Sequence, residues 1–166
     1  MSTATLISVE EYLKTSYPDG DREYVDGVVV ERNMGTFQHA RWQTRMVVYL
    51  ANKYPAIWAV VECRVQVQAT RFRVPDISCG LFPEPESAII RRPPLLVIEI
   101  LSPDDRADDV QEKVDDYLSF GVEYVWVVNP RTRRGFVYTQ DGMREAKDGI
   151  LRTVNPDIAL PLAEIL

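Results

Sequence analysis

The sequence predicts a single α/β domain over residues 1–166, built from a mixed β-sheet flanked by helices. Two observations carry this prediction. Residues 95–101 are almost wholly apolar, which is typical of a central strand covered on both faces. A helical pattern at 107–120 follows, and then a second apolar strand at 124–128. The other expected helices and strands alternate along the chain, which favours the same class.

Composition indicates a folded globular protein. Of the 166 residues, 46% are hydrophobic and 27% are charged, which suits one packed core and argues against disorder. No apolar run approaches the roughly 20 residues that cross a membrane. The first residues lack the basic and apolar pattern of a signal peptide. We therefore expect a cytoplasmic protein without a membrane partner.

The net charge excludes one class of function. A formal charge of −6 argues against a protein that coats nucleic acid by charge alone, because such binding depends on many Lys and Arg contacts to phosphates. It leaves room for a nuclease, since carboxylates without their metal add negative charge. The two cysteines, Cys63 and Cys79, lie in apolar strand-like segments and are interpreted as reduced thiols.

The first third of the chain contains three local signals. Ser8 followed by Glu11 is a capping box, which predicts a short helix there. Asp26-Gly27 between two apolar runs predicts a hairpin. Residues 39–54 have apolar side chains at three- and four-residue steps, so we expect a helix that Pro55 ends.

The middle of the chain predicts strands. Strict alternation of apolar and polar residues over 61–68 indicates one strand with a dry and a wet face, and 72–78 indicates another. Prolines in 83–94 predict a loop. A last strand is expected at 136–139, followed by an irregular tail in which Leu160, Leu162, Ile165 and Leu166 pack.

Glu99 is the residue that most clearly departs from its surroundings. It lies inside an apolar strand, where a lone carboxylate is costly to bury unless it is paired, protonated or bound to a metal. Because strand side chains alternate, Glu99 shares a face with Val97 and Leu101. We favour a metal ligand in a cleft; the alternative is the buried half of a structural ion pair.

Asp76 is the second candidate carboxylate. It follows Pro75 inside a predicted strand, and proline cannot donate to the strand ladder, so the strand is bent or freed there. Of the Pro-Asp dipeptides, this one precedes a strand that carries a buried acid. The alternative is a turn-forming role beside the proline. Two carboxylates from neighbouring strands, with the backbone carbonyl of Ile100, would suit Mg²⁺ or Mn²⁺.

The motifs in order resemble a known family. Pro75-Asp76 followed by Glu99-Ile-Leu101 looks like the PD…(D/E)XK signature of restriction-endonuclease-like proteins. More specifically, the chain resembles the Uma-two-type family of small bacterial proteins. The matching stretches are Glu23-Tyr-Val-Asp-Gly27, His39 at a helix start, Arg73-Val-Pro-Asp76, Val97-Ile-Glu-Ile-Leu-Ser-Pro103, Asp109 with Lys113, and Gly121-Val-Glu-Tyr-Val-Trp-Val-Val-Asn-Pro130. The resemblance covers most of the chain and implies a restriction-endonuclease-like fold and an endonuclease.

The chain departs from the superfamily pattern at one position. Leu101 stands where the lysine of the signature belongs, and the resemblance suggests that the lysine has moved to Lys113 on the following helix. Lys113 lies at the border of the apolar stripe, so its stem can cover apolar surface while its ammonium reaches the carboxylates. The alternative is a pair with Asp109 on a wet helix face.

Two further residues are candidates for the site. The superfamily often adds an early acidic residue, which makes Glu23 a candidate; the alternative is a surface charge beside the hairpin. His39 is the one histidine; it contacts phosphate or water in one reading and is a partly buried helix residue in the other. Trp42, Trp58 and Trp126 are interpreted as core residues.

The leading hypothesis is a Mg²⁺- or Mn²⁺-dependent nuclease acting on DNA, with Asp76 and Glu99 as ligands and Lys113 stabilising charge at the phosphate. The first alternative is a nucleic-acid-binding or regulatory protein that kept the fold and lost turnover, as Leu101 and the acidic charge suggest. The second is a structural or toxin-like partner protein whose acids are only ion-paired. Exposed apolar residues in the tail and edge strands also make a homodimer reasonable.

Overall fold

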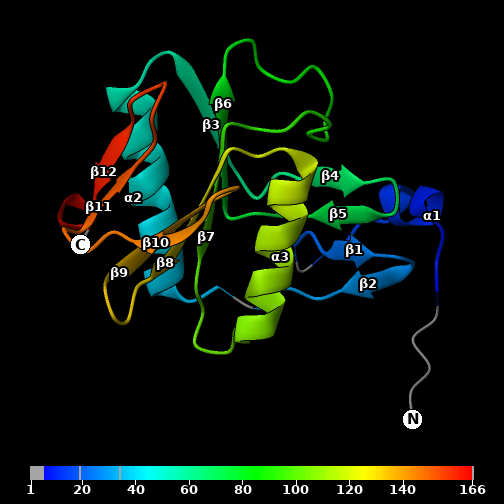
Figure 1. Ribbon diagram of the computed structural model, residues 1–166. Coiled ribbons are helices and arrows are strands. Elements are labelled where there is room, and N and C mark those ends of the chain that lie inside the picture. The colour runs from blue at the N-terminus through cyan, green and yellow to red at the C-terminus, as the bar shows by residue number, and fades with distance from the viewer. Residues whose placement is uncertain (1–5, 19, 34, 166) are drawn as a thin grey trace.

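The computed structural model describes residues 6–18, 20–33 and 35–165 (Figure 1). The helices are α1 (Val9–Lys14), α2 (Phe37–Lys53) and α3 (Ala107–Phe120), with a 3-10 turn η1 (Leu162–Glu164) near the end. The strands are β1 (Glu23–Val25), β2 (Val28–Val30), β3 (Ile57–Val61), β4 (Val65–Gln68), β5 (Arg71–Arg73), β6 (Ile77–Leu81), β7 (Leu96–Ile100), β8 (Tyr124–Asn129), β9 (Arg134–Thr139), β10 (Gly142–Glu145), β11 (Ile150–Arg152) and β12 (Ala159–Pro161).

The main sheet has six strands in the order β10-β9-β8-β7-β6-β3. Only the β7–β8 pair among them is parallel, and α3 makes the crossover that such a pair requires. All five residues of β7 are buried, as expected for an inner strand. The predicted α/β class, the central strand and the helix at 107–120 are therefore confirmed. Gly121 ends α3 with φ of 109°, a left-handed conformation that glycine adopts without strain.

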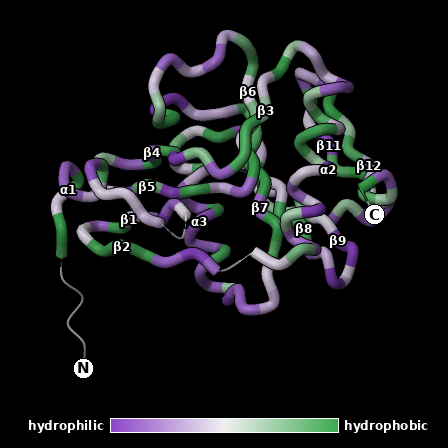
Figure 2. The backbone as a smooth tube through the Cα atoms, turned by 180° about the vertical axis from the view of Figure 1, so that it is seen from behind, coloured by the Kyte–Doolittle hydropathy of each residue, from purple (hydrophilic) through white to green (hydrophobic). Residues whose placement is uncertain are grey.

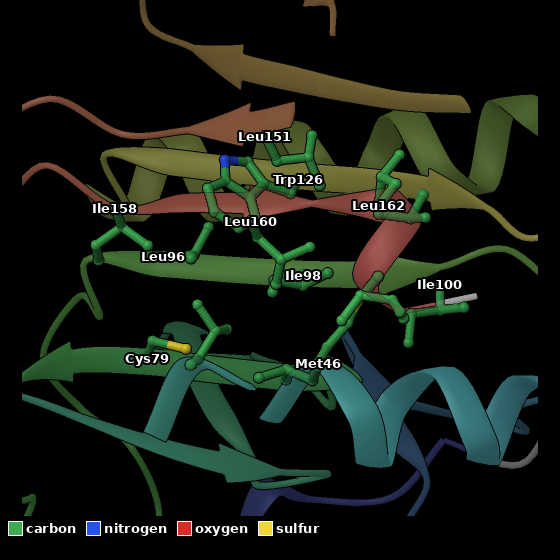
Figure 3. Close-up of a cluster of buried hydrophobic side chains, with 14 of the residues drawn as sticks. Met46, Cys79, Leu96, Ile98, Ile100, Trp126, Leu151, Ile158, Leu160 and Leu162 are labelled. Atoms are coloured by element: carbon green, nitrogen blue, oxygen red, sulfur yellow. The ribbon is translucent and has the colours of Figure 1, made fainter. Parts of the chain in front are cut away.

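The two faces of the main sheet are covered by different helices. Leu96, Ile98 and Ile100 share one hydrophobic cluster with Met46 of α2, and Figure 3 shows them between Met46 and Trp126. The other face packs on α3, where Val97 shares a cluster with Val114 and Tyr117. The hydrophobic colouring in Figure 2 follows β3, β6 and β7 through the middle of the molecule. Because side chains alternate along β7, Glu99 lies on the α3 face.

A smaller sheet, β2-β1-β5-β4, lies beside α1 and away from α2 (Figure 1). Its own hydrophobic cluster contains Tyr12, Tyr24 and Phe72. The predicted helix is confirmed, with Ser8 as its N-cap, because the Glu11 N–H donates to the Ser8 side chain at 3.1 Å. The hairpin is confirmed as well: Asp26-Gly27 joins β1 to β2 with positive φ at both residues.

The prediction of one continuous strand over 61–68 and another over 72–78 was wrong, because each of these segments is divided between the two sheets. β3 ends at Val61, and Glu62, with φ of 51°, redirects the chain into β4 of the small sheet. In the same way β5 belongs to the small sheet and β6 to the main sheet, with residues 74–76 crossing between them. Alternating polarity cannot reveal such a break, because both sheets need the same alternation. Asp76 consequently lies where the chain passes between the sheets.

The expectation of an irregular tail was also wrong. β10 pairs with β9, and β11 pairs with β12 in a two-stranded sheet whose Leu151 and Leu160 are fully buried in the main core. Glycine, proline and charged residues hide these strands from a local reading, and tertiary packing forms them. Leu162 and Ile165 pack as expected, whereas Leu166 lies outside the described residues.

The remaining core assignments are simple. Trp42, Trp58 and Trp126 are buried, as the sequence predicted. Cys79 is a buried free thiol, and Cys63 is a half-buried one. Within the described ranges, none of the helices is both long and apolar enough to cross a membrane.

Candidate active site

The backbone of Asp76 is fixed by two donors from other elements. The Gln43 side-chain amide of α2 donates to the Asp76 carbonyl at 2.9 Å, and the Glu62 N–H donates to the same oxygen at 3.2 Å. Glu62 adopts a left-handed backbone conformation, which is rare for residues other than glycine and clusters at functional positions. These two hydrogen bonds fix the backbone of Asp76 at the crossing between the two sheets, and so fix the direction of its side chain.

The Asp76 carboxylate is buried and has three partners. Its Oδ2 accepts the Ile100 backbone N–H at 2.7 Å and lies 3.2 Å from His39 Nε2. Its Oδ1 lies 3.2 Å from Arg32 Nη2. The side chain thus bonds directly to the end of β7, one residue after Glu99.

Pro75 leaves the carbonyl of Ile100 without a ladder partner. The β6–β7 register pairs Ile77 with Ile98, and its continuation sets Pro75 opposite Ile100. Proline has no N–H, so it cannot donate to the Ile100 carbonyl as a ladder partner would. The N–H of the same residue donates to Asp76 Oδ2, so the backbone of Ile100 is turned to the candidate ligand rather than to a sheet ladder.

Glu99 is oriented from α3. The Tyr117 hydroxyl, fully buried, donates to Glu99 Oε1 at 2.6 Å. Burial raises the pKa of Glu99 to about 7; the Lys113 ammonium opposes this rise, and the Asp76 carboxylate adds to it. The two candidate ligands are therefore near enough to repel each other, and a cation between them would relieve that repulsion.

Lys113 reaches inward rather than along its own helix. Its Nζ lies 3.0 Å from Glu23 Oε1, and none of the ion pairs among the described residues joins it to Asp109. Burial opposes the charged form, but the Glu99 and Glu23 carboxylates outweigh burial and raise the lysine pKa above its ordinary value. Lys113 is therefore protonated beside the Glu23 and Glu99 carboxylates. It does not form the alternative pair with Asp109 on an exposed helix face.

Glu23 is buried rather than a surface charge. Its Oε1 also accepts the Val74 N–H at 3.2 Å, and its Oε2 lies 3.1 Å from Arg73 Nη1. Burial raises its pKa, but the cations Lys113 and Arg73 outweigh that effect, and the net shift is downward. Glu23 is thus held ionised at the base of the site.

Arg73 ties this base to α3. Its Nε donates to Asp116 Oδ2 at 2.7 Å, and its side chain is only 4% exposed. Arg71, two residues earlier on the same face of β5, also contacts Asp116 and reaches Glu112 at 3.1 Å. The network clamps β5 of the small sheet to the helix that carries Lys113 and Tyr117.

His39 approaches Asp76 from the first turn of α2. Thr36 caps this helix by accepting the His39 N–H at 3.1 Å. The hydrogen bond to Asp76 raises the pKa of His39, against an opposing effect of burial. The imidazole, with a side chain 11% exposed, contacts the Asp76 carboxylate at 3.2 Å.

The residues fit a divalent ion held through few protein ligands. In the described part of the chain, no three His, Cys, Asp or Glu side chains gather as a ready-made cage. The donor set is instead two mutually repelling carboxylates, Asp76 and Glu99, and the Ile100 carbonyl. Mg²⁺ characteristically takes one or two carboxylates and completes its shell with water and phosphate, so the chemistry of this set suits it.

The structure brings all five sequence candidates into one region: Glu23, His39, Asp76, Glu99 and Lys113. Sequence reasoning missed three partners of these residues. Tyr117 fits the apolar face of the helix predicted at 107–120, although its i+4 relation to Lys113 is a usable signal. Arg32 and Gln43 carry no such signal in the sequence, because both contact Asp76, a residue more than thirty positions away.

Comparisons with known proteins give the family and the fold. The family profile Uma2, described as "Putative restriction endonuclease", matches residues 9–163. A solved structure titled as a putative nuclease belonging to DUF820 from Anabaena variabilis superposes with a TM-score of 0.80. It shares 24% identity over 96% of this chain and 97% of its own, which shows a common fold. A search of proteins with curated descriptions found no match.

Proposed function

The chain belongs to the Uma2 family, and from that premise we propose that it is a metal-dependent endonuclease that hydrolyses phosphodiester bonds in DNA. One observation supports this most: the Ile100 N–H bond to Asp76 Oδ2 ties the two candidate metal ligands together at the end of β7. A purely structural ion pair has no need of a second buried carboxylate, Asp76, that adds to the rise in the pKa of Glu99.

In this proposal Asp76, Glu99 and the Ile100 carbonyl hold Mg²⁺ or Mn²⁺. The ion, when bound, supplies a water of lowered pKa and neutralises charge on the phosphate. Tyr117 fixes the Glu99 carboxylate by its hydrogen bond. Residues that hold a ligand in place in this way commonly affect metal affinity by one to two orders of magnitude, about 10- to 100-fold.

Lys113 supplies the fixed positive charge of the site. Its raised pKa keeps it protonated at neutral pH, so it can stabilise negative charge that develops on the phosphate. Glu23 holds the ammonium from behind at 3.0 Å, and Arg73 in turn holds Glu23. This assigns Lys113 the part that the signature lysine plays elsewhere, delivered here from α3 while Leu101 occupies the usual position.

The alternative is a nucleic-acid-binding or regulatory protein that retains the fold without turnover. Leu101 and the net charge of −6 favour it. The two readings share the site and differ only in whether bonds are cut.

Two experiments in sequence separate these readings. Mn²⁺ or Mg²⁺ should raise the melting temperature of the wild type, because a ligand that binds only the folded state stabilises it. Asp76→Asn should abolish that rise, whereas Asp148→Asn, at an exposed aspartate paired with Arg152, should keep it. An equal rise in wild type and Asp76→Asn places the ion elsewhere and overturns the proposal.

A supercoiled-plasmid assay then tests turnover. Metal-dependent nicking that is lost in Glu99→Gln supports the endonuclease. Metal binding without nicking, on DNA of varied sequence, supports the binding protein. We also expect a homodimer, and the mass of the protein in solution measures it directly.

A further inference from the structure

Arg32 is the site residue whose charge the proposed mechanism leaves unused. It follows β2 in the small sheet, and its Nη2 lies 3.2 Å from Asp76 Oδ1. Its Nη1 lies 3.8 Å from Glu62 Oε2. One guanidinium therefore bridges a candidate metal ligand and a second carboxylate at the same site.

The occupancy of Asp76 makes this contact significant. A carboxylate offers about four acceptor positions, two on each oxygen. On Asp76 Oδ2 the Ile100 N–H and the His39 imidazole take both. Arg32 takes one of the positions on Oδ1. The oxygen that retains capacity for a metal is thus the one that a guanidinium already contacts.

Accessibility places Arg32 on the outer side of the ligand. The Asp76 side chain is 6% exposed, the Arg32 side chain 19% and the Glu62 side chain 47%. The guanidinium spans from the buried carboxylate toward the open one. A divalent ion that reaches Asp76 Oδ1 from solvent must therefore compete with Arg32 for it.

We infer that Arg32 serves two anions in turn: it neutralises Asp76 in the metal-free protein and binds the substrate phosphate when a divalent ion takes Asp76. This inference rests on the proposed function. Arginine remains charged at any physiological pH, so displacement from Asp76 leaves a cation that needs an anion. Its planar fork matches the oxygens of a phosphate, and Glu62 keeps it beside the site in the meantime.

Two binding measurements on Arg32→Gln test this without any need for turnover. Affinity for Mn²⁺ alone, measured by calorimetry, should rise about fivefold, the upper end of what an accessible ion pair contributes. Affinity for inorganic phosphate in saturating Mg²⁺ should fall about tenfold or more, because charge-assisted hydrogen bonds are lost. The two affinities should change in opposite directions. If Arg32 were only structurally important, its loss would weaken the binding of both Mn²⁺ and phosphate.

Two further variants keep the test decisive. Arg22→Gln is the matched control: this arginine pairs with Glu31 at 3.0 Å, and its removal should change neither affinity. Arg32→Lys retains the charge and loses the fork, so phosphate binding should be intermediate between wild type and Arg32→Gln. Arg32→Lys also tests the proposed role of Arg32 if Arg32→Gln folds poorly.

The possible failures are distinguishable. A wild type that binds no Mn²⁺ overturns the proposed function together with this inference. A wild type that binds Mn²⁺, with Arg32→Gln unchanged or weakened for the metal, overturns the role of Arg32 alone. Tighter Mn²⁺ binding with unchanged phosphate affinity also overturns it, because Arg32 would then only compete with the ion.

Discussion

The Tyr117 hydroxyl and the Glu99 carboxylate form a buried hydrogen bond of 2.6 Å between α3 and β7. The bond joins a helix to the strand that precedes it and fixes one carboxylate oxygen. Lys113 lies one turn earlier on the same helix, so α3 carries both the group that orients the acid and the cation that faces it.

Removal of this hydroxyl should therefore affect the metal more than the fold. Tyr117→Phe keeps the ring in its cluster, so we expect a loss of about 1–2 kcal/mol in the free energy of unfolding, from one unmet buried acceptor. Mn²⁺ affinity should fall about tenfold because Glu99 is no longer oriented. Calorimetric titration and a melting curve measure the two effects. Tyr138→Phe, at a half-buried tyrosine of β9, should alter neither.

Lys113→Met should separate charge from packing. The methionine keeps much of the apolar stem, and Glu23 retains Arg73 and the Val74 N–H as partners. We expect Mn²⁺ binding to persist and cleavage to fall by roughly 3–4 kcal/mol in activation free energy, the scale of a lost preorganised charge. Lys14→Met, at an exposed lysine of α1, is the control for the loss of a positive charge. Unchanged cleavage in Lys113→Met would limit Lys113 to a structural pairing.

Arg73→Met should be the most destabilising change in the network. Arg73 is buried between Glu23 and Asp116, and its removal takes from each buried carboxylate one of its two cations. Breaking such a buried pair costs about 3–5 kcal/mol. Arg134→Met removes an exposed arginine that pairs with Glu145 and should cost at most about 1 kcal/mol. Urea unfolding of both variants gives the comparison, and equal losses would contradict the role assigned to Arg73.

Gly80→Ala tests the packing beneath the β3–β6 pair. A Cβ at Gly80 would lie 2.3 Å from Cζ2 of Trp58, and the indole N–H of Trp58 is held by the Leu81 carbonyl at 3.0 Å. The ring cannot yield freely, so overpacking should cost about 1–3 kcal/mol. At Gly35 a Cβ would meet only His39 Nδ1 at 3.7 Å, an ordinary contact. Thermal melting should therefore show a larger fall for Gly80→Ala than for Gly35→Ala.

The sequence predicted the parts of the fold that local patterns specify. The apolar run at 95–101 became β7 (Leu96–Ile100), and the amphipathic run at 107–120 became α3 over the same residues. Those patterns depend on period and burial alone. The break at Glu62 and the strands after 141 depend on tertiary contacts that no local pattern contains, and both were missed.

The candidate site was anticipated unevenly for a related reason. Glu99 violates its apolar context, and Asp76 follows a proline in a strand, so each is visible without a structure. The residues that contact Glu99 and Asp76 are not unusual in their own sequence context. Arg32 and Gln43 are ordinary polar residues until the fold sets them against a residue 44 and 33 positions away, respectively. The sequence therefore shows which residues are energetically unfavourable to bury. It does not show which residues stabilise them.

The passage of residues 74–76 from the small sheet to the main sheet has a consequence for the order in which the protein matures. Glu23 and Arg73 belong to one sheet, Glu99 to the other, and Lys113 to the helix packed on both. A chain leaving the ribosome has all of the candidate metal ligands before α3 is complete. Lys113 arrives with that helix, so the candidate carboxylates lack this cation until α3 docks.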